Sequence, residues 1–387
     1  MKNKRSKNIL QKLFITVVYL SIGAVCGIII GDYAFNFAGE KSVTEMLLDI
    51  MLLFVGFYVG MLVQIVIHEA GHLVFGLISG YRFFSFRILS ITIIKTDGKI
   101  RIKRLKIPGT AGQCLMVPPD FKDGKIPVAL YNFGGAIMNL LSVAVFAGLH
   151  FLFSGAPFAA TMMSVFALVG FLLALTNGIP LRMGMINNDG VNALELMRDP
   201  EAMHSFWVQL KVAEQTAKGV RLKDMPDEWF VVPADGSMKN AMTTVKGVLV
   251  CNRLVDAKEL DRARTAIRHM LEIDSGMIEL HRRMLICDLV FIEIVNDAYK
   301  NDIDRLLDKK QKSFIKKMKT NPSVVRAQYF YALMCEKNGI KAEKIKKRFD
   351  LICNIYPYSS ELEIEKEFMS DEFVTALFKE RLEKNNI

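Results

Sequence analysis

The sequence lacks the cysteine pattern of a disulfide-stapled or zinc-knuckle protein. Its 387 residues contain six cysteines, and no two of them stand in a Cys-x-x-Cys spacing. A disulfide framework or a cysteine-rich zinc site requires paired spacings. We therefore interpret these residues as reduced thiols, most of them buried, in a protein that faces the cytosol.

The second half of the chain lacks an apolar run long enough to cross a membrane. A transmembrane helix needs about 20 apolar residues, and the best candidate there, 284–295, is too short and contains Asp288 and Glu293. The first 180 residues, in contrast, contain four long apolar runs. With 51% hydrophobic and 23% charged residues overall, the composition indicates a membrane half followed by a soluble half.

Four membrane-spanning helices are predicted, over residues 13–30, 46–80, 128–153 and 158–176. The first is longer than the core of a typical signal peptide and has no evident small-x-small cleavage site, so we predict that it is retained. Basic residues precede it, and the positive-inside rule then places both chain ends in the cytosol of a multi-pass cell-membrane protein. The net charge of +10 is explained by cytosolic loops beside an anionic lipid bilayer, and we expect no nucleic-acid partner.

A basic segment between the second and third spans has the pattern of strands. Residues 87–95 are rich in β-branched side chains, and apolar residues roughly alternate with basic ones over 100–107. The turn signal Thr96-Asp97-Gly98 lies between them, so a β-hairpin is predicted. This hairpin would either hold the topology as a basic loop against lipid or offer a strand edge to an unwound peptide.

From about residue 192 the chain has the pattern of amphipathic helices broken by proline and glycine. We predict a transmembrane core over residues 1–198 and a cytosolic helical domain over 199–387, which would bind any cytosolic protein partner. The whole is an all-α polytopic membrane protein with a β-hairpin insertion and a soluble helical domain. Stacked hairpins of the tetratricopeptide kind are one arrangement, but the 34-residue signature is degraded. The predicted helices of the soluble domain lie near 239–256, 257–272, 276–297, 302–319, 322–338, 340–355 and 371–384.

Histidine is scarce, with six in the chain, yet two histidines stand four residues apart inside the second span. The stretch His68-Glu69-Ala70-Gly71-His72 places both imidazoles on one face of a helix, where they can bind one metal ion. Glu69 is placed to act on a water at that metal. A chance match is the alternative. Ionisable residues inside a bilayer cost roughly 2.5–3.5 kcal/mol each on insertion scales, however, so three of them clustered there indicate function.

A catalytic zinc ion keeps about three protein ligands and one open position. Asp189 is the best candidate for the third ligand, because it follows the helix break at residues 177–180 and arrives on the same side of the membrane as His72. A role as a helix cap or turn residue is the alternative, given the composition Asn-Asn-Asp-Gly. Glu195 and Asp199 are weaker candidates.

These motifs, in this order, resemble those of the site-2 protease family of intramembrane zinc metalloproteases. The resemblance covers about residues 44–198 and rests on the His-Glu-x-x-His stretch, a glycine-and-asparagine helix at 134–139, and Asn-x-x-Pro leading to Asp-Gly at 177–190. In that family the histidines and the aspartate bind zinc, the glutamate is the catalytic base, and asparagines help to receive the substrate. The resemblance therefore implies zinc binding by His68, His72 and Asp189, base catalysis by Glu69, and substrate binding by Asn139, Asn177 and Asn187. Asn139 is a polar residue in an apolar helix, and a helix–helix hydrogen bond is the alternative role for it.

The chain departs from the family pattern in several places. The gap from Pro180 to Asp189 is longer than usual, a hydrophobic residue is replaced by Asn188, and Gly134-Gly135 stands in place of Gly-Pro. The outer loops are too short for a PDZ domain, and the helical tail does not resemble a CBS domain. The resemblance therefore bears on the core chemistry and leaves the choice of substrate open.

The predicted function is that of a zinc-dependent intramembrane endopeptidase. It would cut a transmembrane or membrane-associated segment of a regulatory protein or a signal-peptide precursor near the cytosolic face, after local unwinding of the substrate helix. The competing prediction is a catalytically silent, membrane-anchored binding scaffold that uses the helical domain. A metal transporter or sensor is a third possibility, but it would need further ligands along a pore, and the sequence shows none.

Overall fold

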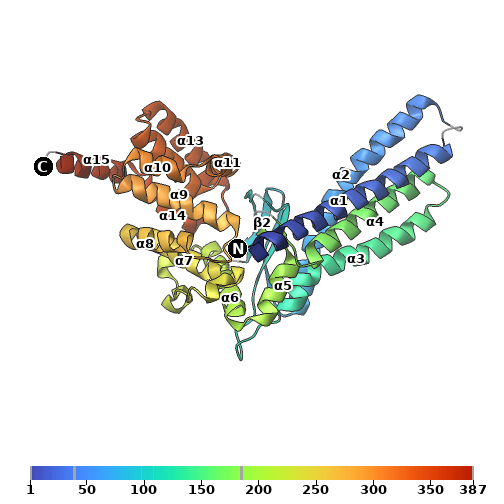
Figure 1. Cartoon of the computed structure of the whole chain (residues 1–387), viewed down its shortest axis with the longest axis horizontal. Helices are drawn as coiled ribbons and strands as arrows, with labels where there is room; N and C mark the ends of the chain where they lie inside the picture. The colour runs from blue at the N-terminus through green and yellow to red at the C-terminus, as the bar shows by residue number, and fades with distance from the viewer. Residues whose placement is uncertain (1, 38–40, 97, 108, 184–185, 386–387) are drawn as a thin grey trace. The chain divides into compact units, whose positions relative to one another are not determined.

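The structure is a computed structural model that describes residues 2–37, 41–96, 98–107, 109–183 and 186–385. It divides into two compact units that interleave along the chain (Figure 1). The segment between the second and third long helices groups with the C-terminal part of the chain. The first unit comprises Met1–Tyr81, Pro127–Met183 and Asn187–Leu194, and the second comprises Arg82–Ile126, Gly184–Ile186 and Glu195–Ile387.

The first unit is a bundle of four long helices in which α4 packs against each of the other three (Figure 1). All four are long and apolar enough to cross a membrane, as the sequence predicted. At a rise of about 1.5 Å per residue, the 36 residues of the second helix extend about 54 Å, well beyond the roughly 30 Å hydrocarbon core of a bilayer. The helices are α1 (Lys2–Phe37), α2 (Val43–Ile78), α3 (Val128–Leu152) and α4 (Pro157–Gly178).

Glycines bring the backbones of this bundle into direct contact. A Cβ atom added at Gly134 in α3 would lie 2.7 Å from the carbonyl oxygen of Gly71 in α2, and one added at Gly71 would overlap the carbonyl oxygen of Gly134. Backbone atoms cannot move aside as a flexible side chain can, so this crossing requires the absence of side chains at both positions. The crossing lies between His68 and His72 on α2 and five residues before Asn139 on α3.

The predicted β-hairpin is part of a larger antiparallel sheet with the strand order β3-β2-β1-β4. The turn between β2 and β3 lies where the sequence placed it, although Asp97 is outside the described residues. Residues 87–95, predicted as one strand, belong to two, because the chain reverses at Leu89, whose φ is 54°. The strands are β1 (Arg82–Ile88), β2 (Ile91–Thr96), β3 (Lys99–Arg104) and β4 (Gly112–Val117).

Apart from this sheet, the described residues of the second unit are mainly helical, as predicted. Two short strands, β5 (Arg182–Met183) and β6 (Ile186–Asn187), and then α5 (Asp189–Arg198) lie where the chain passes from the first unit to the second, and the remaining elements follow α5 in order. These elements are α6 (Pro200–Ala217), η1 (Leu222–Asp224), η2 (Asp227–Phe230), η3 (Ser237–Lys239), α7 (Ala241–Asp256), α8 (Leu260–Glu272), α9 (Glu279–Val295), α10 (Lys300–Leu306), α11 (Lys309–Lys317), α12 (Pro322–Phe330), η4 (Tyr331–Cys335), α13 (Gly339–Ile355), α14 (Ser359–Phe368) and α15 (Asp371–Asn385).

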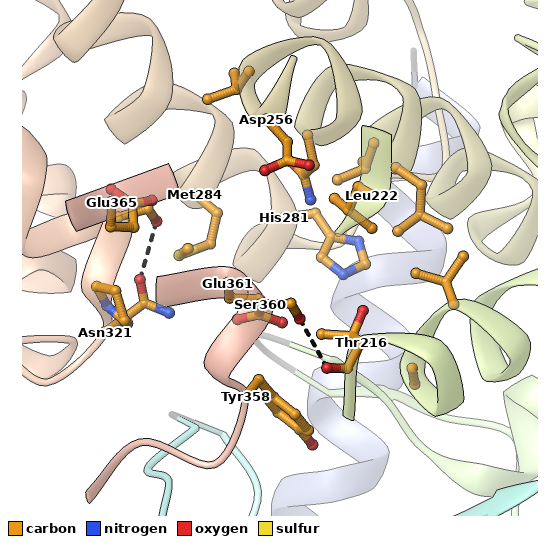
Figure 2. Close-up of a pocket in the computed structure, with 18 of the residues that line it drawn as sticks. Thr216, Leu222, Asp256, His281, Met284, Asn321, Tyr358, Ser360, Glu361 and Glu365 are labelled. Carbon is orange, nitrogen blue, oxygen red and sulfur yellow. Dashed lines mark hydrogen bonds between the residues drawn. The ribbon is translucent and has the colours of Figure 1, made fainter. Parts of the chain in front are cut away.

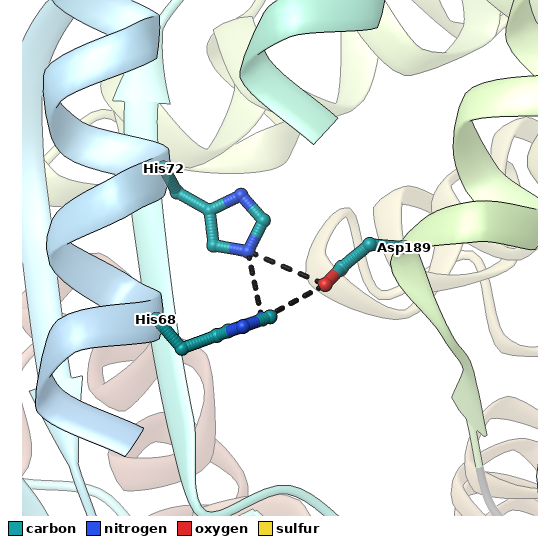
Figure 3. A group of neighbouring side chains, drawn as sticks. All are labelled: His68, His72 and Asp189. Carbon is teal, nitrogen blue, oxygen red and sulfur yellow. Dashed lines mark hydrogen bonds and ion pairs between the residues drawn. The ribbon is translucent and has the colours of Figure 1, made fainter. Parts of the chain in front are cut away.

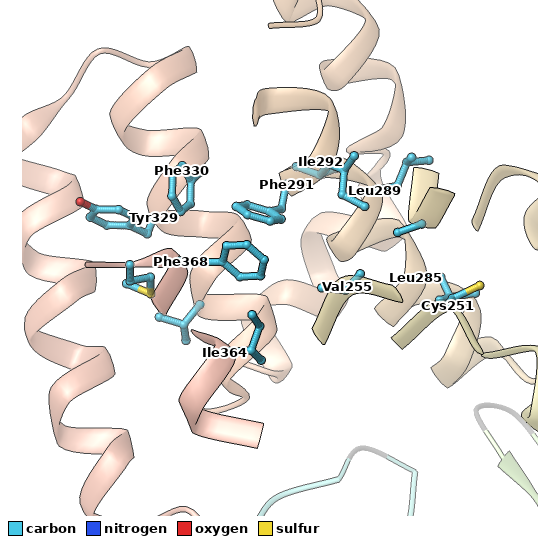
Figure 4. Packing of buried hydrophobic residues seen from close by; sticks show 14 of the residues in the cluster. Cys251, Val255, Leu285, Leu289, Phe291, Ile292, Tyr329, Phe330, Ile364 and Phe368 are labelled. Atoms are coloured by element: carbon cyan, nitrogen blue, oxygen red, sulfur yellow. The ribbon is translucent and has the colours of Figure 1, made fainter. Parts of the chain in front are cut away.

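The helical part of the second unit has its own core (Figure 4). The ring of Phe291 lies 5.0 Å from that of Phe330 and 4.7 Å from that of Phe368 between centroids, and all three side chains are buried. Arg326 is buried against the Phe291 ring, and its charge is paired with the carboxylates of Asp288 and Glu365. A buried charge is costly unless it is paired, so this ion-pair group is built into the core.

Candidate metal centre

His68 and His72 lie one turn apart on α2, and both rings face Asp189, the first residue of α5 (Figure 3). The Nε2 atoms of the two histidines are 3.2 Å apart. Asp189 Oδ2 lies 3.0 Å from His68 Nε2 and 3.4 Å from His72 Nε2. The structure therefore brings together the three residues that the sequence singled out as metal ligands, with donor atoms within 4.8 Å of one another.

Each imidazole is oriented by a hydrogen bond at its other nitrogen. His68 Nδ1 lies 2.6 Å from Asn139 Oδ1, and His72 Nδ1 lies 2.7 Å from the carbonyl oxygen of Tyr131. A carbonyl oxygen can only accept, so each Nδ1 carries the proton and each neutral ring keeps a lone pair on Nε2. Asn139 is itself held in this orientation, because its Nδ2 donates to the backbone oxygen and to Oε1 of Gln64, at 3.0 and 2.8 Å.

This arrangement fits a divalent metal ion of the zinc type. Two nitrogen lone pairs and a carboxylate oxygen converge on one point, where they repel one another unless a cation or a proton lies between them. Two histidines and one carboxylate form a donor set typical of catalytic zinc, and metal-binding histidines commonly donate their second N–H to an oxygen, as both do here.

Asn188 fixes the position of Asp189. Its Nδ2 donates to the carbonyl oxygens of Thr176, at 2.7 Å, and Ile179, at 2.5 Å, near the end of α4. Its Oδ1 accepts from the backbone N–H of Leu181 and, as a cap of α5, from that of Val191. A capping role was the alternative interpretation of Asp189, and Asn188 fills that role instead. The Asp189 side chain faces the histidines.

The other predicted residues have different surroundings. Glu69 is buried on α2 between the two histidines. Asn177 donates its Nδ2 to the carbonyl oxygen of Leu173, whereas the buried Nδ2 of Asn187 has no hydrogen-bond partner among the described residues. Within the described part of the chain, neither Glu195 nor Asp199 belongs to the metal-binding group. Asp199 instead caps α6 by accepting from the N–H groups of Glu201 and Ala202.

Sequence reasoning missed Gln64, and for Asn139 it left a substrate contact and a helix–helix hydrogen bond open. Both side chains are fully buried. Ser142 donates to Gln64 Oε1, and Gln64 Nε2 donates to the carbonyl oxygen of Phe166, so a polar network joins three helices behind His68. Because this network engages both ends of the Asn139 amide, the geometry gives Asn139 a role in positioning His68. A signal was available, since residues 64, 68 and 72 form a polar stripe at a spacing of four.

We expect Asn139→Ala to weaken zinc binding by about 10–100-fold, the usual effect of losing a hydrogen bond to a metal ligand. The His68 ring would lose the acceptor that fixes its tautomer and orientation. Competition against a chromophoric zinc chelator measures the affinity. Ser142→Ala is the matched control, because Ser142 contacts Gln64 and not the histidine, and it should change the affinity less. Equal zinc affinity in Asn139→Ala and the unaltered protein would contradict this role.

No protein family matches the sequence, and neither a curated protein nor a solved structure matches the chain.

Proposed function

We propose that the protein is a zinc-dependent intramembrane endopeptidase. The proposal rests on the convergence of two Nε2 lone pairs and one carboxylate oxygen. Carbonyl acceptors set the tautomers of both histidines, and these histidines lie on a helix apolar enough to cross a membrane. Zinc bound there would act as a Lewis acid on a peptide carbonyl and lower the pKa of a water. His68, His72 and Asp189 are the residues that would hold it.

Glu69 is the proposed general base. It stands next to His68 in the chain, is buried, and is not one of the three converging donors. A carboxylate in this position can take the proton of the attacking water and pass it to the leaving amine. The aspartate and the histidines would hold the metal, so Glu69 is the carboxylate of the His-Glu-x-x-His stretch that would be available to move a proton.

The proposed substrate is a transmembrane or membrane-associated segment of a regulatory protein or a signal-peptide precursor. His72 lies six residues before the end of α2, about 9 Å along the helix axis. The basic segment that follows α2 would place this end of the helix at the cytosolic face. A helical substrate must unwind to expose its backbone. The amide donor of Asn187, which has no partner among the described residues, is suited to bind a peptide carbonyl.

Removal and return of the metal test the proposal directly. Full-length protein purified in detergent should contain about one zinc ion per chain. It should cleave a labelled peptide of about 25 apolar residues with a Gly-Pro break near one end, a length that spans a bilayer. A chelator should abolish cleavage, and added zinc should restore it.

Two results would redirect the proposal. Protein without stoichiometric zinc, and with no gain of activity on zinc addition, would favour the catalytically silent scaffold. Bound zinc with no cleavage in a panel of such peptides, varied in the position of the Gly-Pro break, would leave a metal-binding role without proteolysis.

A further inference from the structure

The helical part of the second unit contains a cavity of about 400 Å³, far in the sequence from the metal ligands (Figure 2). Its volume lies in the range of pockets that bind small molecules or short peptide segments. Much of its lining is aliphatic, with Val212 from α6, Val248 and Leu249 from α7, and Ile364 from α14. The cavity therefore offers a partner an apolar surface.

Several polar side chains at the cavity have no side-chain hydrogen bond within the described part of the chain. Gln209 on α6, Asn252 on α7 and His281 on α9 all line it, and none forms a side-chain hydrogen bond with the described residues. All three side chains are half-buried, so each can exchange hydrogen bonds with a molecule bound in the cavity. Burial lowers the pKa of His281 to about 4, so at neutral pH its ring is uncharged, with one donor and one acceptor. Carboxamides have the same donor and acceptor pair, which matches the N–H and C=O groups of a peptide backbone.

The charges around the cavity leave one carboxylate without a cation. Arg221 pairs with Asp256, and Arg326 pairs with Asp288 and Glu365. The remaining lining carboxylate, Glu361, is solvent-exposed, accepts a hydrogen bond of 2.6 Å from the Tyr356 hydroxyl and forms no ion pair within the described residues. Lys106 also lines the cavity but is exposed and does not pair with Glu361. The site is therefore complementary to an added positive charge beside an apolar wall.

We propose that this cavity is a binding site for a short peptide segment that carries one basic side chain between aliphatic residues. The lysine or arginine of the peptide pairs with Glu361, and the aliphatic side chains pack on the α6, α7 and α14 wall. The peptide backbone exchanges hydrogen bonds with Gln209 and Asn252. The site would take a segment of another protein, and this role holds whether or not the metal centre is catalytic.

Binding of two matched peptide pools to the full-length protein in detergent tests the site. The probes are fluorescent, acetylated and amidated pentapeptides with mixed aliphatic residues around a central lysine, and the same pool with a central glutamate. We expect the lysine pool to bind at least tenfold more tightly in fluorescence anisotropy. Glu361→Gln keeps the size and the Tyr356 hydrogen bond but removes the charge, and it should bring the ratio close to one.

Two further variants locate the effect. Glu363→Gln lies on the same helix but outside the cavity lining, and it should leave the ratio unchanged. Asn252→Ala should weaken both pools by a similar factor, because it removes a backbone contact and no charge. The proposal is overturned if the lysine pool does not bind, if the preference for lysine survives in Glu361→Gln, or if Glu363→Gln removes it as well.

Discussion

Glu69→Gln is expected to abolish peptide hydrolysis and to leave one zinc ion bound per chain. Glutamine has the size of glutamate but cannot accept the proton of the attacking water. Loss of a general base lowers a rate by typically 10²–10⁴-fold, so the remaining cleavage should be near background. The three converging donors do not include Glu69, and the metal should therefore stay. Zinc analysis and peptide cleavage on the same preparation measure both effects.

Glu45→Gln is the matched control for this substitution. Glu45 lies on the same helix, where its carboxylate accepts from the backbone N–H of Ser42 in a capping box. The control should keep both zinc and activity. Loss of zinc in Glu69→Gln would identify Glu69 as a ligand, and undiminished cleavage would end the hydrolase proposal.

Asp189→Asn should lower the zinc affinity by more than Asn139→Ala does and should remove activity. The substitution keeps the size of the side chain but removes the negative charge that faces both Nε2 atoms. Loss of a direct ligand should exceed the roughly 10–100-fold effect of losing a partner of a ligand. Titration with a competing chelator gives the affinity, and far-UV circular dichroism verifies that the helices remain folded.

The acidic residues that follow Asp189 serve as controls for this substitution. Asp199→Ala removes a helix cap, which costs about 1 kcal/mol of stability, and it should leave zinc bound. Glu195→Ala should likewise leave zinc bound. If zinc remained stoichiometric in Asp189→Asn and were lost from either control, the assignment of the third ligand would be wrong.

Long-range apolar patterning made much of the membrane-length bundle predictable. Runs of 20 or more apolar residues have few alternatives to a helix, and α2, α3 and α4 lie close to their predicted bounds. The pair His68 and His72 was predictable for a related reason, because a spacing of four on a helix fixes a shared face. Asp189 was predictable as the third ligand because it follows a helix break that returns the chain to the side of the membrane where His72 lies.

Contacts between distant segments were not predictable in the same way. The Asn188 side chain bonds to backbone groups on both sides of a turn, and its sequence surroundings indicate only a turn. The role of Asn139 depends on the crossing of α2 and α3, which no local pattern specifies. The sequence predicted two strands where the sheet has four, partly for a local reason. The left-handed conformation at Leu89 splits a continuous β-branched run into two strands. Helix α14 begins shortly after Pro357, and no predicted helix covered it.

Substitutions that disrupt the proposed metal centre are not limited to its ligands and its general base. Alleles that add only a methyl group at Gly135 would place it 2.5 Å from the His68 ring, which the Asn139 amide holds in place. A side chain at Gly134 would push against the backbone of Gly71, and one at Gly190 would push against the backbone of Gly178. A loss-of-function screen would thus recover positions that carry no reactive group, with every ligand intact. The glycines with open space around them would be silent in the same screen, and these include Gly23, Gly27, Gly31 and Gly148.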